Sequence, residues 1–219
     1  MSVLRSLAGA LSYFTILPAG RSDGPPDRTT MAWLPPVGAL VGAICGGCGW
    51  LAWRYLGTPW GAVVPFALGI VLTGALHLDG FLDCCDALCA SVPPERRREI
   101  LKDPRHGTFA FAGGAIVAAV ALAALSRFPY ASFGGWGSVA AMAAVPMLAR
   151  MAAVANLDAP RRPALAAVYG VLAAPGTLAA FAFKRWATGR LGGGESGDIY
   201  GACIVAIEIA ALFGLSLRY

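Results

Sequence analysis

The sequence has few charged residues. Asp, Glu, Lys and Arg together make up 13% of its 219 residues, whereas about a quarter of the residues in a soluble domain are charged. Hydrophobic residues make up 58%, and the mean hydropathy is +0.65. The shortage of charge excludes an ordinary soluble domain and predicts an integral membrane protein.

Histidine is also scarce, with two residues in the chain, and the six cysteines lie mostly in or beside apolar stretches. Free thiols behave there as small hydrophobes. The Cys45-Gly-Gly-Cys48 spacing resembles half of a zinc or redox site, but it falls within an apolar span without a nearby histidine. We therefore expect no metal there. The net charge of +5 needs no nucleic-acid partner, because membrane proteins gather Lys and Arg on their cytoplasmic face.

Apolar windows that meet or approach the length of a membrane-spanning helix occur five times, at 34–53, 60–76, 108–126, 133–149 and 199–217. A sixth run, 164–183, has Pro175-Gly176 near its middle. It fits either a re-entrant hairpin of two half-helices or a single kinked span. The sequence thus predicts an all-α, polytopic membrane helix bundle of about five to seven membrane segments. We expect one membrane-embedded catalytic domain over residues 1–219.

The distribution of basic residues predicts the orientation of the bundle. Fourteen of the 17 Lys and Arg residues fall in the long polar segments 1–33, 77–107, 150–162 and 184–198, which we therefore place in the cytoplasm. This placement requires the run 164–183 to enter and leave by one face. The first 18 residues resemble a secretory signal only in part, because Pro18 and bulky residues stand where a cleavage site would lie. We expect them to be retained at the membrane surface.

Three aspartates gather at the end of the second apolar window, in "TGALHLDGFLDCCDAL". Asp79, Asp83 and Asp86 are four and three residues apart, so on a helix they share one face. Repelling carboxylates need a counter-charge, which an arginine from 96–98, a proton or a metal ion can supply. A divalent cation with oxygen ligands, such as Mg²⁺, fits the carboxylates best. Zinc is the weaker choice, and the nearby His77 is either a helix-end residue or catalytic.

Two further polar segments contain residues suited to binding phosphate. In "KDPRHGTF", basic residues and His106 precede Gly107-Thr108 at the start of an apolar span, where helix N–H groups attract anions. In "GRLGGGESGDIYGA", glycines permit close approach of a ligand to the backbone, and Asp198 begins the last span. Glu208 lies about 15 Å deeper along that helix and is expected to be paired or protonated.

A divalent cation, phosphate-binding groups and a polar acceptor at one membrane surface fit phosphoryl or phosphonucleotidyl transfer. A cation-coupled transporter is the rival from another class. It would spread charges through the spans, whereas here only Glu208 clearly lies within one.

These motifs resemble those of the adenosylcobinamide-GDP ribazoletransferases, also called cobalamin synthases. "LHLDGFLDCCDAL" is similar to that family's LHLDG-x-x-D-x-x-D-G/A-L signature, "ILKDPRHGTFAF" to its IMKD-x-R-x-G-T-F/Y segment, and "GGESGDIYGA" to its GG-x-T-G-D-x-x-GA run. The motifs occur in the family's order over most of the chain. Ser196 stands where threonine is usual, and "MAAVANLDAPRRPAL" fits the family pattern poorly.

The resemblance implies transfer of the phosphocobinamide group of adenosylcobinamide-GDP to α-ribazole or its 5′-phosphate. GMP leaves, and Mg²⁺ is the implied cofactor. It further implies a multi-pass protein of the bacterial inner or plasma membrane, and the distribution of basic residues puts the active site on the cytoplasmic side of that membrane. Membrane lipid is an expected partner, and a homo-oligomer is compatible with the sequence. A CDP-alcohol phosphotransferase-like enzyme is the nearest alternative chemistry.

The residues expected to form the site fall into three groups. Metal binding is assigned to Asp79, Asp83 and Asp86, with Asp86 as either third ligand or base. Catalysis is assigned to the same aspartates and His77. Substrate binding is assigned to Lys102, Asp103, Arg105, Gly107, Thr108, Gly193, Gly194, Ser196, Gly197 and Asp198.

Overall fold

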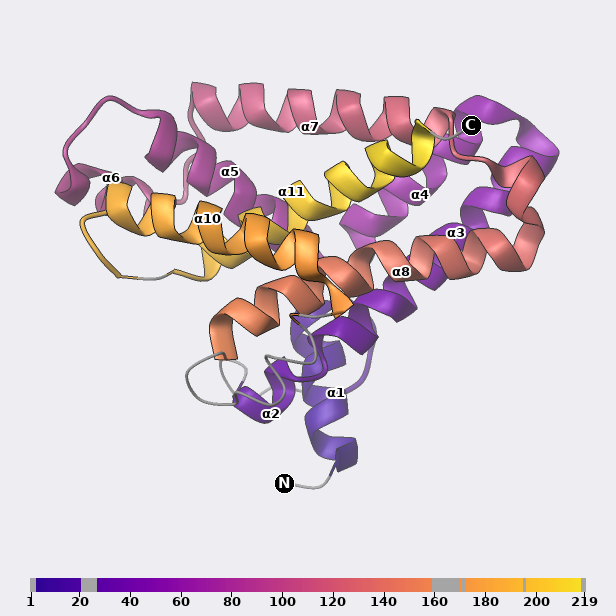
Figure 1. Ribbon diagram of the computed structural model, residues 1–219, viewed down its shortest axis with the longest axis horizontal. Helices are drawn as coiled ribbons and strands as arrows, with labels where there is room; N and C mark the ends of the chain where they lie inside the picture. Colours follow the sequence, from indigo (N-terminus) through magenta and orange to yellow (C-terminus); the bar gives the residue numbers. More distant parts are fainter. Residues whose placement is uncertain (1–2, 21–26, 159–169, 171, 195, 218–219) are drawn as a thin grey trace.

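The computed structural model describes residues 3–20, 27–158, 170, 172–194 and 196–217, which form helices and no β-strand. The all-α fold class is thus confirmed. The helices are α1 (Val3–Phe14), α2 (Arg28–Met31), α3 (Leu34–Leu56), α4 (Thr58–Leu72), α5 (Leu76–Cys89), α6 (Pro94–Ile100), α7 (Thr108–Ser126), α8 (Tyr130–Asp158), α10 (Ala174–Arg190) and α11 (Gly197–Ser216) (Figure 1).

Four helical stretches among the described residues are long and apolar enough to cross a membrane. They are Thr29–Leu56, Thr108–Ser126, Tyr130–Asn156 and Gly197–Ser216, and the bent pair α4 and α5 makes a fifth if it counts as one span. They coincide with the apolar windows of the sequence. The bundle is therefore that of a multi-pass membrane protein.

Glycines on α3 allow the backbones of α3 and α8 to pack closely at the centre of the bundle. A Cβ atom at Gly42 would lie 2.2 Å from the carbonyl oxygen of Met142, and one at Gly46 would lie 2.7 Å from that of Ser138. Side chains there would force the two backbones apart. Small residues serve the same purpose between membrane helices in general, because lipid gives apolar side chains no reason to associate.

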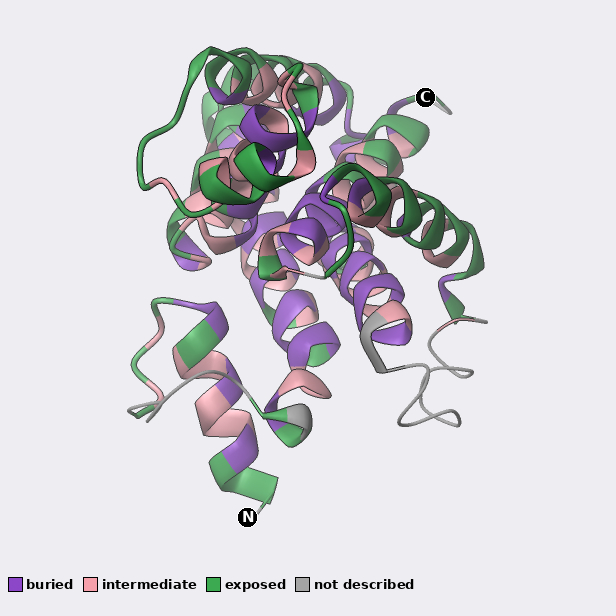
Figure 2. Cartoon of the chain, turned by 90° about the vertical axis from the view of Figure 1, so that its left-hand side faces the viewer, coloured by how far each residue is buried: buried purple, intermediate pink, exposed green. Residues whose placement is uncertain are grey.

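The outer surface of the bundle is apolar, as contact with lipid requires. On α7, only 22% of the most apolar stretch is buried, and the side chains of Phe111 and Ile116 are 80% and 64% exposed. Figure 2 shows exposed residues along the outside of the helices and buried residues in the central ones. An apolar surface of this extent is typical of a membrane interface.

A sharp turn separates α4 from α5, whose axes differ by 88°. Gly74 and Ala75 both have positive φ values, 57° and 59°, and the Ala75 N–H donates to the carbonyl of Ile70 at 2.9 Å. Two left-handed residues after a helix end it and redirect the chain. The segment beginning at 77, which the sequence marked as polar, is therefore a helix that runs nearly perpendicular to the preceding span.

The run 164–183 is described only in part, because 159–169 and 171 lie outside the described residues. Pro175 stands in the first turn of α10, where proline is well tolerated. The far end of α10 meets α5 and α6: Arg190 donates to the carbonyl of Leu88 at 2.8 Å, and Arg98 donates to that of Leu191 at 2.9 Å. Residue 190 thus lies beside the end of α5, and Figure 1 shows that end of α10 next to α6. The re-entrant hairpin stays a prediction.

Candidate active site

Helix α5 separates an acidic outer face from a buried inner face. The side chains of Asp79 and Asp83 are 61% and 17% exposed, whereas His77 is buried, with its ring 6.4 Å from that of Phe14. Residues two positions apart lie about 200° apart around a helix. His77 therefore points into the bundle while Asp79 points outward, and the structure does not bring His77 to the aspartates.

Glycines let α5 and α11 approach closely, and this contact places Asp198. A Cβ atom at Gly80 would be 2.9 Å from the Cα atom of Asp198, and one at Gly201 would be 3.2 Å from the carbonyl oxygen of His77. Asp198, in the first turn of α11, thereby lies near enough to Asp83 for their charges to interact. Two motifs more than a hundred residues apart in the chain meet here.

Asp86 lies on the same helix but has different partners from the other two aspartates. It is buried, and its carboxylate accepts hydrogen bonds from the backbone N–H groups of Gly107 and Ala110, the latter at 2.9 Å. Asp86 thus caps the N-terminus of α7, the position at which a carboxylate is favoured. Gly107 leaves no room for a side chain, since its Cβ would be 2.9 Å from Oδ1 of Asp86.

His106 completes a group with Asp79 and Asp83. Its Nε2 atom lies 3.4 Å from Oδ1 of Asp79, and its Nδ1 atom lies 3.5 Å from Oδ1 of Asp83. One donor atom from each of the three residues falls within 4.8 Å of the others, so the group could hold a metal ion. The sequence placed His106 in the basic segment without assigning it to the metal site.

The basic segment before α7 is exposed and partly paired with itself. Arg105 donates to both carboxylate oxygens of Asp103, from Nε and Nη2, each at 2.9 Å. These hydrogen bonds hold the pKa of Asp103 below its usual value. Lys102 follows α6 and is exposed, as is Thr108 in the first turn of α7. The cationic side chains are thus accessible to an anionic ligand.

The glycine segment between α10 and α11 has an irregular, open backbone. Gly193 and Gly194 have φ values of 100° and 87°, a region that residues with a Cβ rarely adopt. Both are exposed, and no heavy atom would lie within 4 Å of a Cβ at either position. Ser196 precedes α11 as its N-cap residue, and Gly197 opens the helix. A ligand can therefore approach this backbone closely.

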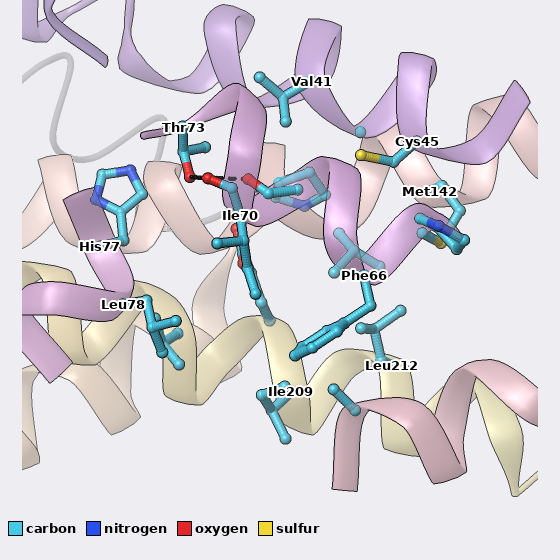
Figure 3. A pocket seen from close by; sticks show the side chains of 18 of the residues that line it. Val41, Cys45, Phe66, Ile70, Thr73, His77, Leu78, Met142, Ile209 and Leu212 are labelled. Carbon is cyan, nitrogen blue, oxygen red and sulfur yellow. Dashed lines mark hydrogen bonds between the residues drawn. The ribbon is translucent and has the colours of Figure 1, made fainter. Parts of the chain in front are cut away.

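A cavity of about 150 Å³ lies inside the bundle beneath the α4–α5 turn (Figure 3). Its walls are mainly apolar side chains such as Phe66, Ile70 and Leu212, but Arg150 and Glu208 also line it. Arg150 donates to the Glu208 carboxylate and to the carbonyl of Pro146 at 3.1 Å. The expectation that Glu208 is paired or protonated is thus met by an arginine on α8. The placement of Arg150 in a cytoplasmic segment was wrong, because this residue is buried within the span Tyr130–Asn156 by its pairing with Glu208.

The donor set at the outer face of α5 suits a divalent cation. Two carboxylates supply hard oxygen ligands, and the exposure of Asp79 leaves room for phosphate oxygens from a substrate. This combination is the usual manner in which Mg²⁺ is bound at phosphate-handling sites. The three carboxylates of Asp79, Asp83 and Asp198 repel one another at close range, so a bound cation would also relieve an electrostatic cost.

Fold and site together define a multi-pass membrane protein with a carboxylate-rich centre at one end of its helix bundle. Residues 6–216 match the sequence model of the cobalamin-5-phosphate synthase family. The chain belongs to this family.

Several curated relatives extend over nearly the whole chain. The adenosylcobinamide-GDP ribazoletransferase of Deinococcus radiodurans is 35% identical, and the alignment covers 95% of this chain and 84% of the relative. The proteins of the same name from Ralstonia pickettii and Pseudomonas entomophila are 30% and 32% identical. Their alignments cover 96% and 95% of this chain and 94% and 97% of the relatives. No solved structure matches the chain.

Proposed function

We propose that this protein is an adenosylcobinamide-GDP ribazoletransferase. It transfers the phosphocobinamide group of adenosylcobinamide-GDP to α-ribazole or its 5′-phosphate. In this reaction a ribazole hydroxyl oxygen forms a bond to the phosphorus next to cobinamide, the bond from that phosphorus to GMP breaks, and GMP leaves. The supporting observation is that the acidic helix α5, the basic segment and the start of α11 converge in a chain of this family.

Asp79 and Asp83 are proposed to hold Mg²⁺. When bound, this ion would stabilise negative charge on the diphosphate oxygens. Asp86 is engaged by the amides of Gly107 and Ala110, so we assign it the positioning of the basic segment against α5. Asp198 lies beside Asp83 and outside the Asp79, Asp83 and His106 group. We propose that it accepts the proton of the attacking hydroxyl.

The basic segment and the glycine segment are proposed to hold the diphosphate. Lys102 and Arg105 are exposed cations, and a guanidinium can exchange the Asp103 carboxylate for a phosphate without losing its paired geometry. The exposed backbone at Gly193 and Gly194 lets a phosphate approach closely, and the N–H groups of Gly194 and Gly197 are proposed to donate to it, because the Gly193 N–H already donates to the carbonyl of Thr188 at 2.9 Å. Ser196, whose Oγ atom is buried, lies between these two glycines. Thr108 adds a hydroxyl at the start of α7.

We further propose that the protein resides in the bacterial inner membrane with this centre in the cytoplasm. The basic residues concentrated at the α5 end of the bundle support that orientation. Positions 103 and 190 would then react with a membrane-impermeant thiol reagent in inverted vesicles and stay protected in intact spheroplasts. Each cysteine is introduced into a background without native cysteines. The opposite labelling pattern would show that the centre lies on the other side of the membrane.

The activity test uses the full chain purified in detergent and incubated with adenosylcobinamide-GDP and α-ribazole. We expect GMP release with Mg²⁺, none after chelation with EDTA, and recovery on adding Mg²⁺ back. Asp83→Asn should abolish release while the protein stays in the membrane. Absence of GMP from the unaltered chain, or full activity of Asp83→Asn, rejects the proposed assignment.

A further inference from the structure

His106 lies where a metal ligand from outside α5 would lie. Its two ring nitrogens are 3.4 Å and 3.5 Å from oxygens of Asp79 and Asp83, longer than the roughly 2.7–2.9 Å of a charge-assisted hydrogen bond. One donor atom from each of the three residues lies within 4.8 Å of the others, so a single ring nitrogen of His106 and the two carboxylates could hold one ion.

The imidazole is held at this place by the backbone of the next residue. Gly107 donates its N–H to Asp86, one helical turn along α5 from Asp83. Ala110 anchors the start of α7 to the same carboxylate. Because residue 107 is fixed to α5, the preceding side chain lies over the turn of α5 that carries Asp79 and Asp83. The packing of α7 against α5 thus places the His106 side chain here before any ligand binds.

One imidazole nitrogen can bind the ion together with both carboxylates. The other nitrogen then carries the proton and can donate it to a partner outside the ion's ligands, such as water. Metal-bound histidines commonly have such a partner, which fixes the ring and its tautomer. The side chain is 41% exposed, so an ion can reach it, and three protein ligands leave positions free for phosphate oxygens.

We propose that His106 is the third protein ligand of the cation held by Asp79 and Asp83, and that its nitrogen shifts the site's preference from Mg²⁺ toward transition-metal ions. This inference rests on the metal site of the proposed function. Imidazole nitrogen is a good ligand for transition metals, whereas Mg²⁺ prefers oxygen. A site of two carboxylates and an imidazole therefore binds Mn²⁺ or Co²⁺ more tightly than Mg²⁺.

The test measures metal binding on the full chain in detergent, without substrates. Mn²⁺ binding is followed by electron paramagnetic resonance, and Mg²⁺ affinity is obtained by competition. We expect His106→Ala to weaken Mn²⁺ binding by about tenfold or more, the lower end of the loss seen on removing even an outer partner of a ligand, with less than about threefold change for Mg²⁺. Equal loss for both ions, or no loss, overturns the proposal.

A spectroscopic measurement on the unaltered chain makes the test independent of how the variant folds. Pulsed electron paramagnetic resonance of bound Mn²⁺ should show coupling to an imidazole nitrogen. The chain has two histidines, so the coupling should persist in His77→Asn and disappear in His106→Asn. Bound Mn²⁺ without nitrogen coupling in the unaltered chain overturns the assignment of His106.

Two more variants separate this inference from the function on which it rests. Asp83→Asn should weaken Mn²⁺ and Mg²⁺ together, since both ions use its carboxylate. If it weakens neither, the carboxylate site itself is wrong and the His106 proposal falls with it. If Asp83→Asn acts as expected but His106→Ala does not, only the His106 proposal fails. Cys89→Ser, which removes an exposed thiol on α5, should leave Mn²⁺ binding unchanged.

Discussion

Gly80 of α5 lies directly against the backbone of Asp198 at the start of α11. A Cβ atom at residue 80 would be 2.9 Å from the Cα atom and 3.2 Å from the carbonyl oxygen of Asp198. Separations this short leave no space for even one methyl group. The absence of a side chain at residue 80 therefore determines how close the acidic helix and the last span come, and with it the position of the Asp198 carboxylate.

Gly80→Ala should accordingly impair the site although it removes no functional group. We expect a loss of about 1–3 kcal/mol in unfolding free energy from overpacking and at least a tenfold fall in GMP release, because about an ångström of displacement can cost two orders of magnitude in rate. Thermal unfolding in detergent and the GMP assay measure the two effects.

The matched control is Gly189→Ala on α10, where no heavy atom would lie within 4 Å of the new Cβ. Alanine is the better helix former, so this variant should be equally or more stable and fully active. Equal behaviour of the two variants would show that the contact between α5 and α11 does not control the site.

The sequence predicts those parts of the fold in which the length of an apolar stretch alone determines where a helix lies. The windows at 108–126 and 199–217 coincide closely with α7 and α11. The turn between α4 and α5 could not be predicted in this way. It depends on two consecutive left-handed residues, Gly74 and Ala75, and alanine gives no local signal for such a conformation.

The candidate site was predictable in its composition but not in the partners of each residue. Helical spacing put Asp79, Asp83 and Asp86 on one face of a helix, and that is where they lie. It could not show that Asp86 is buried under α7 or that His106 reaches the other two. Both contacts cross from one helix to the start of another, and helical periodicity carries no information about such tertiary contacts.

Substitutions of Asp86 and Asp83 should have different effects, with Asp86 affecting stability and Asp83 affecting activity. Asp86→Ala leaves two backbone N–H groups without their acceptor, and we expect a loss of about 1–3 kcal/mol in unfolding free energy. Asp83→Asn removes one of several repelling carboxylates, so its stability should be unchanged or higher while its GMP release is lost. Thermal unfolding of the two variants in the same detergent checks this. Destabilisation by Asp83→Asn equal to that by Asp86→Ala would contradict the division of roles.

Arg97 should stabilise the protein by binding the C-terminal end of α5. The side chain is buried, and its Nη1 atom donates to the carbonyls of Ala87 and Leu88 at 3.0 Å and 2.9 Å. A cation at this end of a helix interacts favourably with the negative end of the helix dipole. Arg97→Gln should lower the unfolding free energy by about 1.5–3 kcal/mol, as expected for hydrogen bonds from a charged group.

Arg96 provides the control for that prediction, because it is the adjacent residue of the same type. Its side chain is 64% exposed and pairs with Glu99 at 2.6 Å, an arrangement that contributes about 0–1 kcal/mol. Arg96→Gln should therefore unfold within a degree or two of the unaltered chain. A similar shift in unfolding temperature for both variants would mean that stability depends on net charge and not on the contact of Arg97 with the end of α5.

The ion pair of Arg150 and Glu208 should be necessary as a pair. The Arg150 side chain is 3% exposed and that of Glu208 is 27% exposed, and both lie within membrane-spanning helices. Glu208→Ala leaves the arginine charge without its partner in an apolar environment, and removal of one member of a buried pair costs about 3–5 kcal/mol.

The double variant Arg150→Met, Glu208→Leu removes both charges and replaces them with apolar side chains. Replacement of a buried pair in this way is often neutral or stabilising, so the double variant should recover most of the stability that Glu208→Ala loses. Thermal unfolding in detergent measures each variant. Recovery of stability without recovery of GMP release would show that the pair contributes to the reaction as well as to folding. An unchanged unfolding temperature for Glu208→Ala would show that the arginine charge is compensated elsewhere.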